Sequence, residues 1–453
     1  MSAGALPGFR DFYPETFAQR SWLFDHWREA ARGFGFVEYD GPPLEPLDLY
    51  TRKSGDEIVG QLYNFTDKGG REISLRPEMT PTVARMVAAR ANALRKPVRW
   101  FSMPQLFRYE RQQKGRLREH FQLNVDIFGE ADVAADAELL AVACTVMRRV
   151  GLGPDDVKAR VSDRRLLAAV LRGLGIAEDA TPAVFAAVDK IGRDDDAALV
   201  KRMRDAGVTT DVAERVLATV RASDFDALAR DFAGNADVEA ALARFADYRA
   251  LLDAHGVLEY LQLDLGIVRG LAYYTGIVFE LFDARGEFRA ICGGGRYDNL
   301  LKALGGVDMP ALGFGMGDVV LGELIVSRLA PGELPPWAST NAPDIWLAAP
   351  EGEPLTGTIR AARALRDGGL RVEYPLRPMS PSKQRKAAWS SSARYLLEPE
   401  GPSADRQFRV KAVAERDALG GQRLAQHFEG RTATIDEIVT AWRSGVGGAT
   451  DRP

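Results

Sequence analysis

The spacing of apolar and polar residues divides the chain into three stretches. In the first, Phe17, Trp22 and Trp27 recur at helical spacing within residues 15–33, which predicts an amphipathic helix. Short apolar runs separated by turn residues predict several strands and two more helices after it. The predicted strands cover residues 36–39, 62–66, 72–75, 98–103, 106–110 and 122–128, and the predicted helices cover 81–93 and 132–149.

The second stretch has a different texture. From about residue 163 to 258 the chain is rich in Ala, Arg, Asp and Leu, and strand patterns are scarce, so we expect a mostly helical insertion. Strand patterns return at residues 261–264, 277–282 and 289–292. The pattern therefore predicts an α+β fold, in which a mainly antiparallel sheet is interrupted by a helical block and then completed.

The third stretch follows a linker rich in proline and glycine at residues 330–343. Strand and helix patterns alternate after it, which predicts a small α/β domain at 344–444 behind a core of residues 1–329. Its strands are expected at 345–349, 370–374, 395–397 and 408–413, and its helices at 356–367 and 383–392. Residues 445–453 are expected to form a disordered tail.

Composition limits the compartment and the partners. The net charge of −4 argues against wholesale coating of nucleic acid but permits a local basic site. No apolar run approaches the roughly 18 residues that span a membrane, and the N-terminus has no secretory signal pattern. Two cysteines, Cys144 and Cys292, cannot build a disulfide framework. Together with the four histidines of the chain they do not show the spacing of zinc ligands. We therefore expect a cytoplasmic protein without a membrane anchor.

A basic loop runs from Arg108 to Arg118, with five basic residues against one acid. Arginine binds phosphate well because its planar fork meets two oxygens at once. The loop could therefore hold a triphosphate, an RNA backbone, or both. The alternative interpretation is a solvated surface loop. It is less favoured because Glu78 and Gln122 lie at the ends of the flanking strands.

Three further motifs leave two interpretations open. Residues 75–81 place Glu78 and a hydroxyl at the mouth of a helix, where they could meet an ammonium group or cap the helix. Residues 268–276 combine an arginine, glycines and a tyrosine pair, which suits ligand contact or a strand that turns at its glycines. Residues 293–298 begin with three glycines, which are a weak signal for a phosphate nest. The segment is not a Walker loop, because no Lys-Ser or Lys-Thr follows at the required spacing.

Taken together and in this order, these motifs resemble those of the histidyl-tRNA synthetases, members of the class II synthetase family. The resemblance covers the chain from Gly8 to about Ile438. It implies a class II antiparallel sheet flanked by helices, with the helical insertion, and an anticodon-binding module at the C-terminus. The pieces that carry it are Arg76-Pro77-Glu78, Phe107-Arg108-Tyr109-Glu110-Arg111, Gln113-Lys114-Gly115-Arg116, Arg269-Gly270-Leu271 with Tyr273-Tyr274, and Gly294-Gly295-Arg296-Tyr297-Asp298. The segment around Pro42 is similar to the family's first motif, which builds a homodimer interface, and Ala311 to Gly317 is similar to its third.

The resemblance assigns roles to residues of this sequence. Arg108 and Arg269 match the two arginines that grip the α-phosphate, and Glu110 matches the residue that orients adenine and helps to hold Mg²⁺. The residues that match histidine contacts are Glu78, Thr80, Gln122, Asp126, Tyr273, Tyr274 and Tyr297. The remaining matches for ATP are Arg116, Arg118, His120 and Phe121, and the expected tRNA contacts are Gln113, Lys114, Arg116, Arg385, Lys386, Arg409 and Lys411.

These roles imply a ligase that uses ATP to activate histidine and then transfers it to its tRNA. Three positions depart from the family pattern. Val320 stands where the third motif has the arginine that holds the γ-phosphate. Either Arg116 or Arg118 substitutes for it, or ATP is bound differently or poorly. Ala272 replaces an aspartate, and His120 replaces the phenylalanine that stacks on adenine.

The missing arginine at Val320 is the one observation that supports an alternative function. A paralogue of the family serves as a regulatory subunit of ATP phosphoribosyltransferase, which binds histidine without charging RNA. That paralogue usually lacks the C-terminal domain and often loses the second arginine, and this chain keeps both. The sequence therefore favours the ligase.

Overall fold

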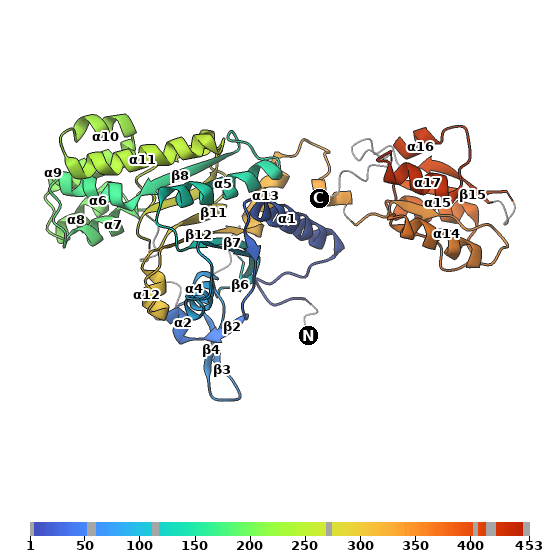
Figure 1. The fold of residues 1–453 in the computed structure, drawn as a ribbon, viewed down its shortest axis with the longest axis horizontal. Helices are drawn as coiled ribbons and strands as arrows, with labels where there is room; N and C mark the ends of the chain where they lie inside the picture. The colour runs from blue at the N-terminus through green and yellow to red at the C-terminus, as the bar shows by residue number, and fades with distance from the viewer. Residues whose placement is uncertain are drawn as a thin grey trace. The chain divides into compact units, whose positions relative to one another are not determined.

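The structure is a computed structural model in which two compact units are distinguished (Figure 1). It describes residues 4–51, 60–110, 117–268, 274–339, 341–401, 406–413 and 423–446. The first unit comprises Met1–Asp11 and Leu23–Arg328, and the second comprises Phe12–Trp22 and Leu329–Pro453. Within the described residues no helix is long and apolar enough to cross a membrane.

A sheet of nine described strands organises the first unit. Its order is β1-β5-β7-β12-β11-β10-β8-β9, and β6 also pairs with β7. The central pairs are antiparallel, whereas β1 joins β5 and β9 joins β8 in parallel. The strands are β1 (Val37–Glu38), β5 (Val98–Ser102), β6 (Gln105–Phe107), β7 (Glu119–Phe128), β8 (Val157–Asp163), β9 (Leu261–Leu263), β10 (Ile277–Asp283), β11 (Cys292–Arg296) and β12 (Ala311–Gly317).

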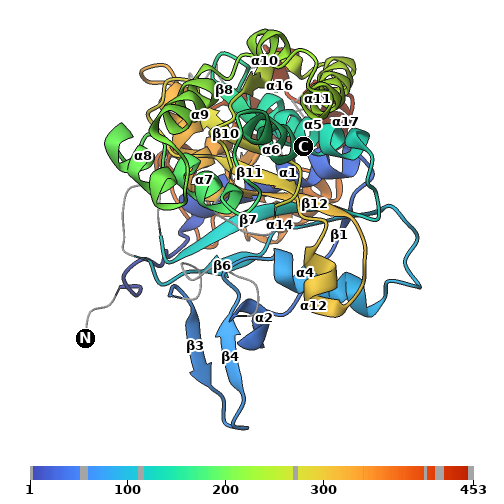
Figure 2. The ribbon, with the colours of Figure 1, turned by 90° about the vertical axis from the view of Figure 1, so that its left-hand side faces the viewer.

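Helices cover both faces of this sheet, which confirms the predicted α+β class. Figure 2 shows α4 and α12 on one side of β7 and β12, and α5 with α11 on the other. The helix α5 is apolar along most of its length and packs on β7, β11 and β12. The helices of this part are α1 (Pro14–Gly33, which crosses from one unit to the other), α4 (Thr80–Ala89), α5 (Val133–Arg149), α12 (Leu300–Gly305) and α13 (Asp318–Arg328).

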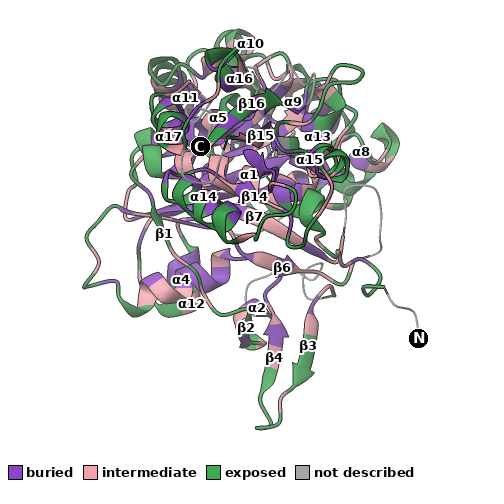
Figure 3. Cartoon of the chain, turned by 90° about the vertical axis from the view of Figure 1, so that its right-hand side faces the viewer, coloured by how far each residue is buried: buried purple, intermediate pink, exposed green. Residues whose placement is uncertain are grey.

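A small second sheet, in the order β2-β4-β3, lies next to β6. The predicted hairpin with a glycine-rich turn is confirmed here: Gly70 has a φ of 75°, and the Asp67 carboxylate accepts from the amides of Gly69 and Arg71 at 2.8 and 2.9 Å. Most side chains of β3 and β4 are exposed or half-buried (Figure 3). The elements are β2 (Leu44–Pro46), α2 (Asp48–Thr51), β3 (Tyr63–Thr66) and β4 (Glu72–Leu75).

The predicted helical insertion is also confirmed. Six described helices separate β8 from β9, and they share an apolar core of their own that includes Leu166, Val184, Leu199 and Val216. The helices are α6 (Arg164–Gly173), α7 (Thr181–Val188), α8 (Asp196–Asp205), α9 (Thr210–Ala222), α10 (Phe225–Asp231) and α11 (Ala236–Ala254), followed by the 3-10 turn η1 (Leu258–Tyr260).

One strand prediction was wrong. The pattern placed a strand at 289–292 and a glycine turn after it, but β11 runs from Cys292 to Arg296 and includes all three glycines. The glycines allow close approach of the neighbouring strands: a Cβ at Gly294 would overlap the Gly313 carbonyl and come 2.7 Å from Phe314 Cα. Glycine carries no β-propensity, so pattern analysis read the run as a turn.

The second unit contains a four-stranded mixed sheet in the order β14-β13-β15-β16. The strand β13 is parallel to β14 and β15, and β16 is antiparallel to β15. Its apolar core includes Ile345, Leu365, Tyr395 and Trp442. The elements are η2 (Pro336–Ser339), β13 (Ile345–Leu347), α14 (Thr356–Asp367), β14 (Val372–Glu373), α15 (Pro381–Ser390), β15 (Tyr395–Glu400), β16 (Gln407–Ala412), α16 (Arg423–His427) and α17 (Ile435–Arg443).

Candidate active site

The strand β7 places the predicted histidine contacts on one face of the main sheet. Because successive side chains of a strand point to opposite faces, His120, Gln122, Asn124 and Asp126 share one face. Asn124 and Asp126 are buried, and Gln122 is half-buried. The face therefore becomes more enclosed from His120 towards Asp126.

Glycines of the neighbouring strand β12 make room for these side chains. Gly313 lies opposite Asp126 in the antiparallel register. A Cβ at Gly313 would overlap the Asp126 carboxylate and come 2.8 Å from the Val125 carbonyl, and one at Gly315 would lie 2.6 Å from Gln122 Cδ. Gly313 and Gly315 thus form a surface without side chains beneath Asp126 and Gln122, which we call the glycine floor. The signal in the sequence is the spacing of two glycines, two residues apart, in an otherwise apolar strand.

Asp126 is the most perturbed acid of this face. Burial raises its pKa to about 7, although a hydrogen bond from the Tyr297 hydroxyl to Asp126 Oδ1 opposes the shift. Tyr297 directly follows β11, and Tyr274, which precedes β10, is also buried. Asp126 and Tyr297 are therefore in direct contact, and the roles of both residues in binding histidine stay predictions.

The helix α4 brings the predicted motif of residues 75–81 to the same region. Its residues Val83 and Val87 pack in one apolar cluster with Tyr274 and Tyr297. Thr80 is its first residue and Glu78 lies buried just before it. The N-cap residue of the helix is Met79, whose side chain makes no cap hydrogen bond, and the two interpretations of Glu78 and Thr80 stay open.

Arg76 fixes the segment that leads into α4. Its guanidinium donates from Nη1 to Asp40 Oδ1 at 2.8 Å and from Nε to the Gln105 carbonyl at 3.0 Å. The Arg76 side chain is buried, so these bonds hold it in one position. The segment that carries Glu78 is thereby tied to β6.

Arg108 lies beside the same segment. Its Nε donates to the Pro77 carbonyl at 2.9 Å, and its Nη1 is 4.0 Å from Glu110 Oε1. The Arg108 side chain is 29% exposed and that of Glu110 is 9% exposed. A cation that is held by a carbonyl and still reaches solvent is placed to meet a phosphate next to Glu78.

His120 and Phe121 point to opposite faces of β7. Burial, with the nearby charges of Arg108 and Arg10, lowers the pKa of His120 to about 3, so its ring is neutral at physiological pH. Phe121 packs edge-on against Phe24 of α1, at 5.4 Å between ring centroids. The alternation of the strand thus turns the Phe121 ring away from His120 and Gln122, and its expected contact with ATP stays a prediction.

Similarity to known proteins agrees with this arrangement. A family model described as histidyl-tRNA synthetase matches residues 8–317, which is more than half of the chain. The chain belongs to the histidyl-tRNA synthetase family.

Two relatives and one solved structure illustrate the similarity to this synthetase family. The histidine–tRNA ligase of Opitutus terrae is 46% identical over 397 residues, which cover 87% of this chain and 90% of the relative. The chloroplastic and mitochondrial histidine–tRNA ligase of Arabidopsis thaliana is 40% identical over 409 residues, covering 90% and 82%. The histidyl-tRNA synthetase of Nostoc sp. PCC 7120 has the same fold, with a TM-score of 0.78 and 21% identity over 98% of this chain and all of that one.

Several predicted synthetase residues lie outside the described parts of the chain. These are Arg269, Ala272, Tyr273, Gln113, Lys114 and Arg116. Arg118 is described: its guanidinium lies 4.3 Å from the centroid of the Tyr109 ring, and its Nε is 3.4 Å from the Glu110 carbonyl. Val320 is half-buried in the first part of α13. A role for Arg118 at the γ-phosphate stays a prediction.

Arg10 is a structural residue that sequence reasoning missed. Its Nε donates to Glu119 Oε1 at 2.6 Å and its Nη1 to Asp318 Oδ2 at 2.9 Å, and both carboxylates are buried. Asp318 also accepts from the Phe121 amide at 3.0 Å. Arg10 thus joins the first residue of β7 to the first residue of α13, which directly follows the segment that is similar to the third synthetase motif. Glu119 and Phe121 share a face of β7, so this cluster lies behind the sheet.

The basic residues that were expected to contact tRNA in the second unit are largely paired with acids. Arg385 donates to Glu398 Oε1 at 2.7 Å, and Lys411 donates to the other oxygen of Glu398. Although partial burial opposes it, these hydrogen bonds hold the pKa of Glu398 below its usual value. Arg409 donates to Glu400 at 2.7 Å, and Lys386 is exposed.

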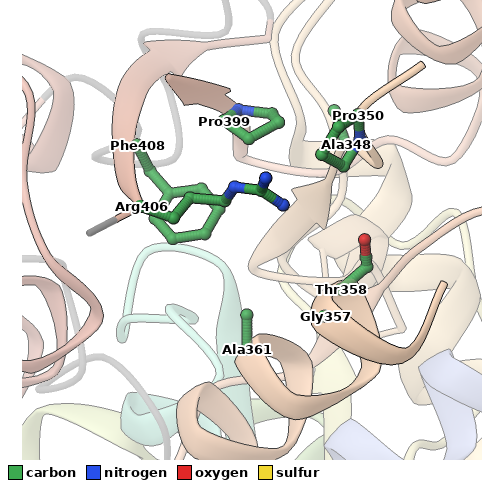
Figure 4. A pocket seen from close by; sticks show the side chains of 8 residues that line it. All are labelled: Ala348, Pro350, Gly357, Thr358, Ala361, Pro399, Arg406 and Phe408. Atoms are coloured by element: carbon green, nitrogen blue, oxygen red, sulfur yellow. The ribbon is translucent and has the colours of Figure 1, made fainter. Parts of the chain in front are cut away.

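A depression in the second unit is separate from these residues (Figure 4). The side chain of Arg406 reaches into it and donates to Glu353 at 2.7 Å. Its other walls are formed by Ala348, Pro350, Gly357, Thr358, Ala361, Pro399 and Phe408. It is too small to be the site of a nucleotide, and the candidate active site remains the face of β7.

Proposed function

We propose that this chain is a histidine–tRNA ligase, which activates histidine with ATP and transfers it to the 3′ end of its tRNA. The observation that carries the proposal is the buried Asp126, which receives a hydrogen bond from Tyr297 above the glycine floor of β12. A carboxylate enclosed in this way suits an imidazole, because it accepts a hydrogen bond from a ring N–H. The relatives that are 40% to 46% identical support the same activity.

Histidine would lie along the face of β7. Glu78, Thr80 and Gln122 would bind its ammonium group, and Asp126 and Tyr274 would meet its two ring nitrogens. Gly313 and Gly315 leave space for the Asp126 and Gln122 side chains beneath the proposed position of the substrate. A buried polar group that is left unpaired raises the free energy of the complex. An amino acid with an apolar side chain of similar size would leave Asp126 and Tyr274 unpaired, so it should be rejected.

ATP would bind at the open end of the same face. Arg108 would neutralise the α-phosphate from the side of Glu78, Arg269 would do so from the opposite side, and His120 would stack on adenine as a neutral ring. Glu110 fits a Mg²⁺ site, because this ion usually binds one or two carboxylates together with phosphate oxygens. When bound, Mg²⁺ would neutralise charge on the leaving pyrophosphate.

The reaction then needs positioning more than covalent chemistry. The histidine carboxylate attacks the α-phosphorus in line, and pyrophosphate leaves. Arg108 is held by the Pro77 carbonyl at 2.9 Å, so its charge is in place before the reaction starts. Oriented charge of this kind stabilises the transition state without reorganisation.

The second step brings tRNA to the activated histidine, and its terminal ribose hydroxyl attacks the adenylate. Gln113, Lys114 and Arg116 are proposed contacts of the acceptor end, and the second unit is proposed to bind the anticodon. The segment around Pro42 is proposed to form a homodimer interface. A cytoplasmic location fits the two cysteines, which are buried and free in the structure.

Charging of tRNA separates this function from a histidine-sensing regulator. Purified protein should esterify histidine to a histidine-tRNA transcript with ATP and Mg²⁺, and should not esterify the other amino acids. Arg108→Ala should reduce charging by about 100-fold or more, because one preorganised donor contributes that much to such reactions. A protein that binds histidine tightly and charges no tRNA would contradict the proposal and favour the regulator.

A further inference from the structure

Residues 6–9 form a tight turn beside the candidate site. The Phe9 amide donates to the Leu6 carbonyl at 2.9 Å, and Gly8 has a φ of 88°. Proline at the second position and glycine at the third are typical of a type II turn, because proline fixes a negative φ and glycine adopts the positive φ without strain. The Pro7-Gly8 pair of the sequence therefore explains why the chain turns here.

This turn is hydrogen-bonded to the stem of the predicted basic hairpin. The hairpin stem consists of residues 107–110 and 117–119, all of which the structure describes. The Gly8 carbonyl accepts from the Arg118 amide at 2.9 Å, and the Arg118 carbonyl accepts from the Arg108 amide at 2.9 Å. Two successive backbone hydrogen bonds thus join Gly8 to Arg108, the proposed contact of the α-phosphate.

Gly8 also packs so closely on Arg118 that a side chain has no room. Gly8 is buried, and a Cβ at this position would lie 2.7 Å from Arg118 Cγ and 2.9 Å from Arg118 Cβ and Cδ. The Arg118 guanidinium lies 4.3 Å from the centroid of the Tyr109 ring, and Arg118 Nε lies 3.4 Å from the Glu110 carbonyl. The bare backbone of Gly8 therefore sets the position of Arg118, which contacts the two residues that follow Arg108.

The two residues after Gly8 contact the hairpin stem with their side chains. The Phe9 ring lies 6.4 Å from the Phe107 ring and 6.0 Å from the Tyr63 ring, between centroids. Arg10 donates to Glu119 at 2.6 Å, and Glu119 is the residue of β7 that pairs with Phe107 of β6. Consecutive residues of this segment thus hold both sides of the hairpin stem.

We propose that Gly8 and Phe9 are positioning residues for ATP, because they fix the hairpin stem that carries Arg108 and Glu110. The inference rests on the proposed function, in which Arg108 meets the α-phosphate and Glu110 meets adenine and Mg²⁺. Neither Gly8 nor Phe9 is expected to touch the nucleotide. Their effect on the reaction is to hold two ATP contacts in place before ATP binds.

The proposed histidine contact Asp126 is held by other elements. It accepts a hydrogen bond from Tyr297, and Gly313 of β12 leaves space for its carboxylate. A displaced hairpin stem should therefore weaken the binding of ATP and leave the binding of histidine unchanged. This difference separates a positioning role at the nucleotide from a general loss of the fold.

Gly8→Ala tests the role in the histidine-dependent exchange of labelled pyrophosphate into ATP. The added Cβ would overlap Arg118, so the KM for ATP should rise by about 10- to 100-fold, because a displacement of about 1 Å has effects of that size. The Kd for histidine, measured by isothermal titration without ATP, should change by less than about 2-fold, as expected for independent sites.

Gly151→Ala is the matched control. Gly151 lies just after α5, has a φ of 82°, and a Cβ there would meet no atom beyond its chain neighbours within 4 Å. Both glycine variants should lose a few degrees in the temperature of thermal unfolding, because alanine disfavours a positive φ. Gly151→Ala should nevertheless keep the KM for ATP within about 2-fold of the wild type.

Phe9→Ala tests the role without a substitution at Gly8. It removes the ring that packs near Phe107 and Tyr63, so the KM for ATP should rise by about 3- to 10-fold, again with an unchanged Kd for histidine. Phe9→Leu should recover part of this loss, because leucine keeps an apolar side chain against Phe107. If Gly8→Ala shows no cooperative unfolding transition, the two Phe9 variants decide the outcome.

An unchanged KM for ATP in both Gly8→Ala and Phe9→Ala would overturn the proposal. An equal loss of histidine binding in these variants would also overturn it, as would an equal rise of KM in Gly151→Ala or no recovery in Phe9→Leu. Wild-type protein without any histidine-dependent exchange would instead overturn the proposed function, so the two failures are distinguishable.

Discussion

The face of β7 in the first unit and the ion-paired surface around Glu398 of β15 in the second unit carry charge in different ways. Asp126 is buried, its pKa is raised to about 7, and its charge is opposed by the enclosure around it. Arg385 and Lys411 lie at the surface and share the carboxylate of Glu398. A buried charge is expensive to maintain, whereas an exposed pair contributes little to stability.

The difference shows where single residues should matter. On β7 the geometry around each side chain is fixed by neighbours, so one added atom or one lost proton should change the reaction. Around Glu398 the cations Arg385 and Lys411 are already neutralised, so each should contribute little to RNA binding by itself. Substitutions on the two surfaces test this contrast, and their expected effects decrease from Gly313→Ala to Arg385→Ala.

Gly313→Ala should have the largest effect. The added Cβ would overlap the Asp126 carboxylate, so either Asp126 or β12 must move. We expect kcat/KM for histidine in the exchange reaction to fall by about 100-fold or more, since the imidazole contact would be displaced.

Gly317→Ala is the control for this substitution. It lies at the end of the same strand, and a Cβ there meets no atom within 4 Å. Its kcat/KM should stay within about 3-fold of the wild type. Equal losses in the two variants would mean that β12 tolerates no side chain for reasons unrelated to Asp126.

Asp126→Asn should weaken activity and strengthen the fold at the same time. The amide oxygen can still accept from an imidazole N–H but carries no negative charge, so we expect exchange to fall by about 10-fold, the difference between a charged and a neutral hydrogen bond. Because the pKa of Asp126 is raised in the folded state, the folded state binds more protons than the unfolded state between about pH 4 and 7.

The sign of the stability change follows from this pKa. Ionised Asp126 destabilises the fold above pH 7, so Asp126→Asn should be more stable than the wild type at pH 8, by about 2–4 kcal/mol. The difference should shrink steadily as the pH falls from 7 towards 4. Urea unfolding at pH 8 and pH 5 measures it, and a difference that grows at pH 5 would show that the pKa is not raised.

Arg10→Ala should destabilise the first unit. The substitution leaves the buried carboxylates of Glu119 and Asp318 without their shared cation. Because Arg10 is 26% exposed, we expect a loss of about 2–4 kcal/mol in the free energy of unfolding, at the lower end for a buried pair.

Arg10→Lys provides the comparison for this loss. It keeps the charge but can no longer bridge both acids with a planar fork, so it should restore part of the stability. Urea unfolding of both variants measures the difference. If Arg10→Ala unfolds at the same urea concentration as the wild type, the bridge does not stabilise the link between β7 and α13.

Arg385→Ala should have the smallest effect. Its cation is paired with Glu398, so we expect the KM for tRNA at physiological salt to rise by less than about 3-fold. Glu398→Gln is the informative partner, because it frees both Arg385 and Lys411 and should lower the KM. A rise of more than about 10-fold in Arg385→Ala would break the contrast between the two faces.

Much of the fold could be predicted because helical and strand periodicities are local properties. The expected helix at residues 356–367 coincides with α14, and the hairpin at 62–75 was expected with its turn. The strand β11 was missed because a glycine run has no side-chain pattern, and only its neighbours β10 and β12 reveal why glycine is needed.

The chemistry of the site was predictable as a set of residues but not as a geometry. The direction of Phe121 depends on the register of β7 with its neighbours, which fixes the face that each side chain meets. The contact of Arg10 with Asp318 joins residues 308 positions apart, and no local pattern encodes it. Long-range contacts of this kind emerge only when the sheet is assembled.

Exchange of labelled pyrophosphate into ATP by the wild-type protein, with histidine and each other amino acid in turn, tests whether the face of β7 activates histidine. Exchange should occur with histidine alone, and it should be lost in Gly313→Ala but not in Gly317→Ala. Exchange that does not depend on histidine, or no exchange despite tight histidine binding, would contradict the claim that the face of β7 activates histidine.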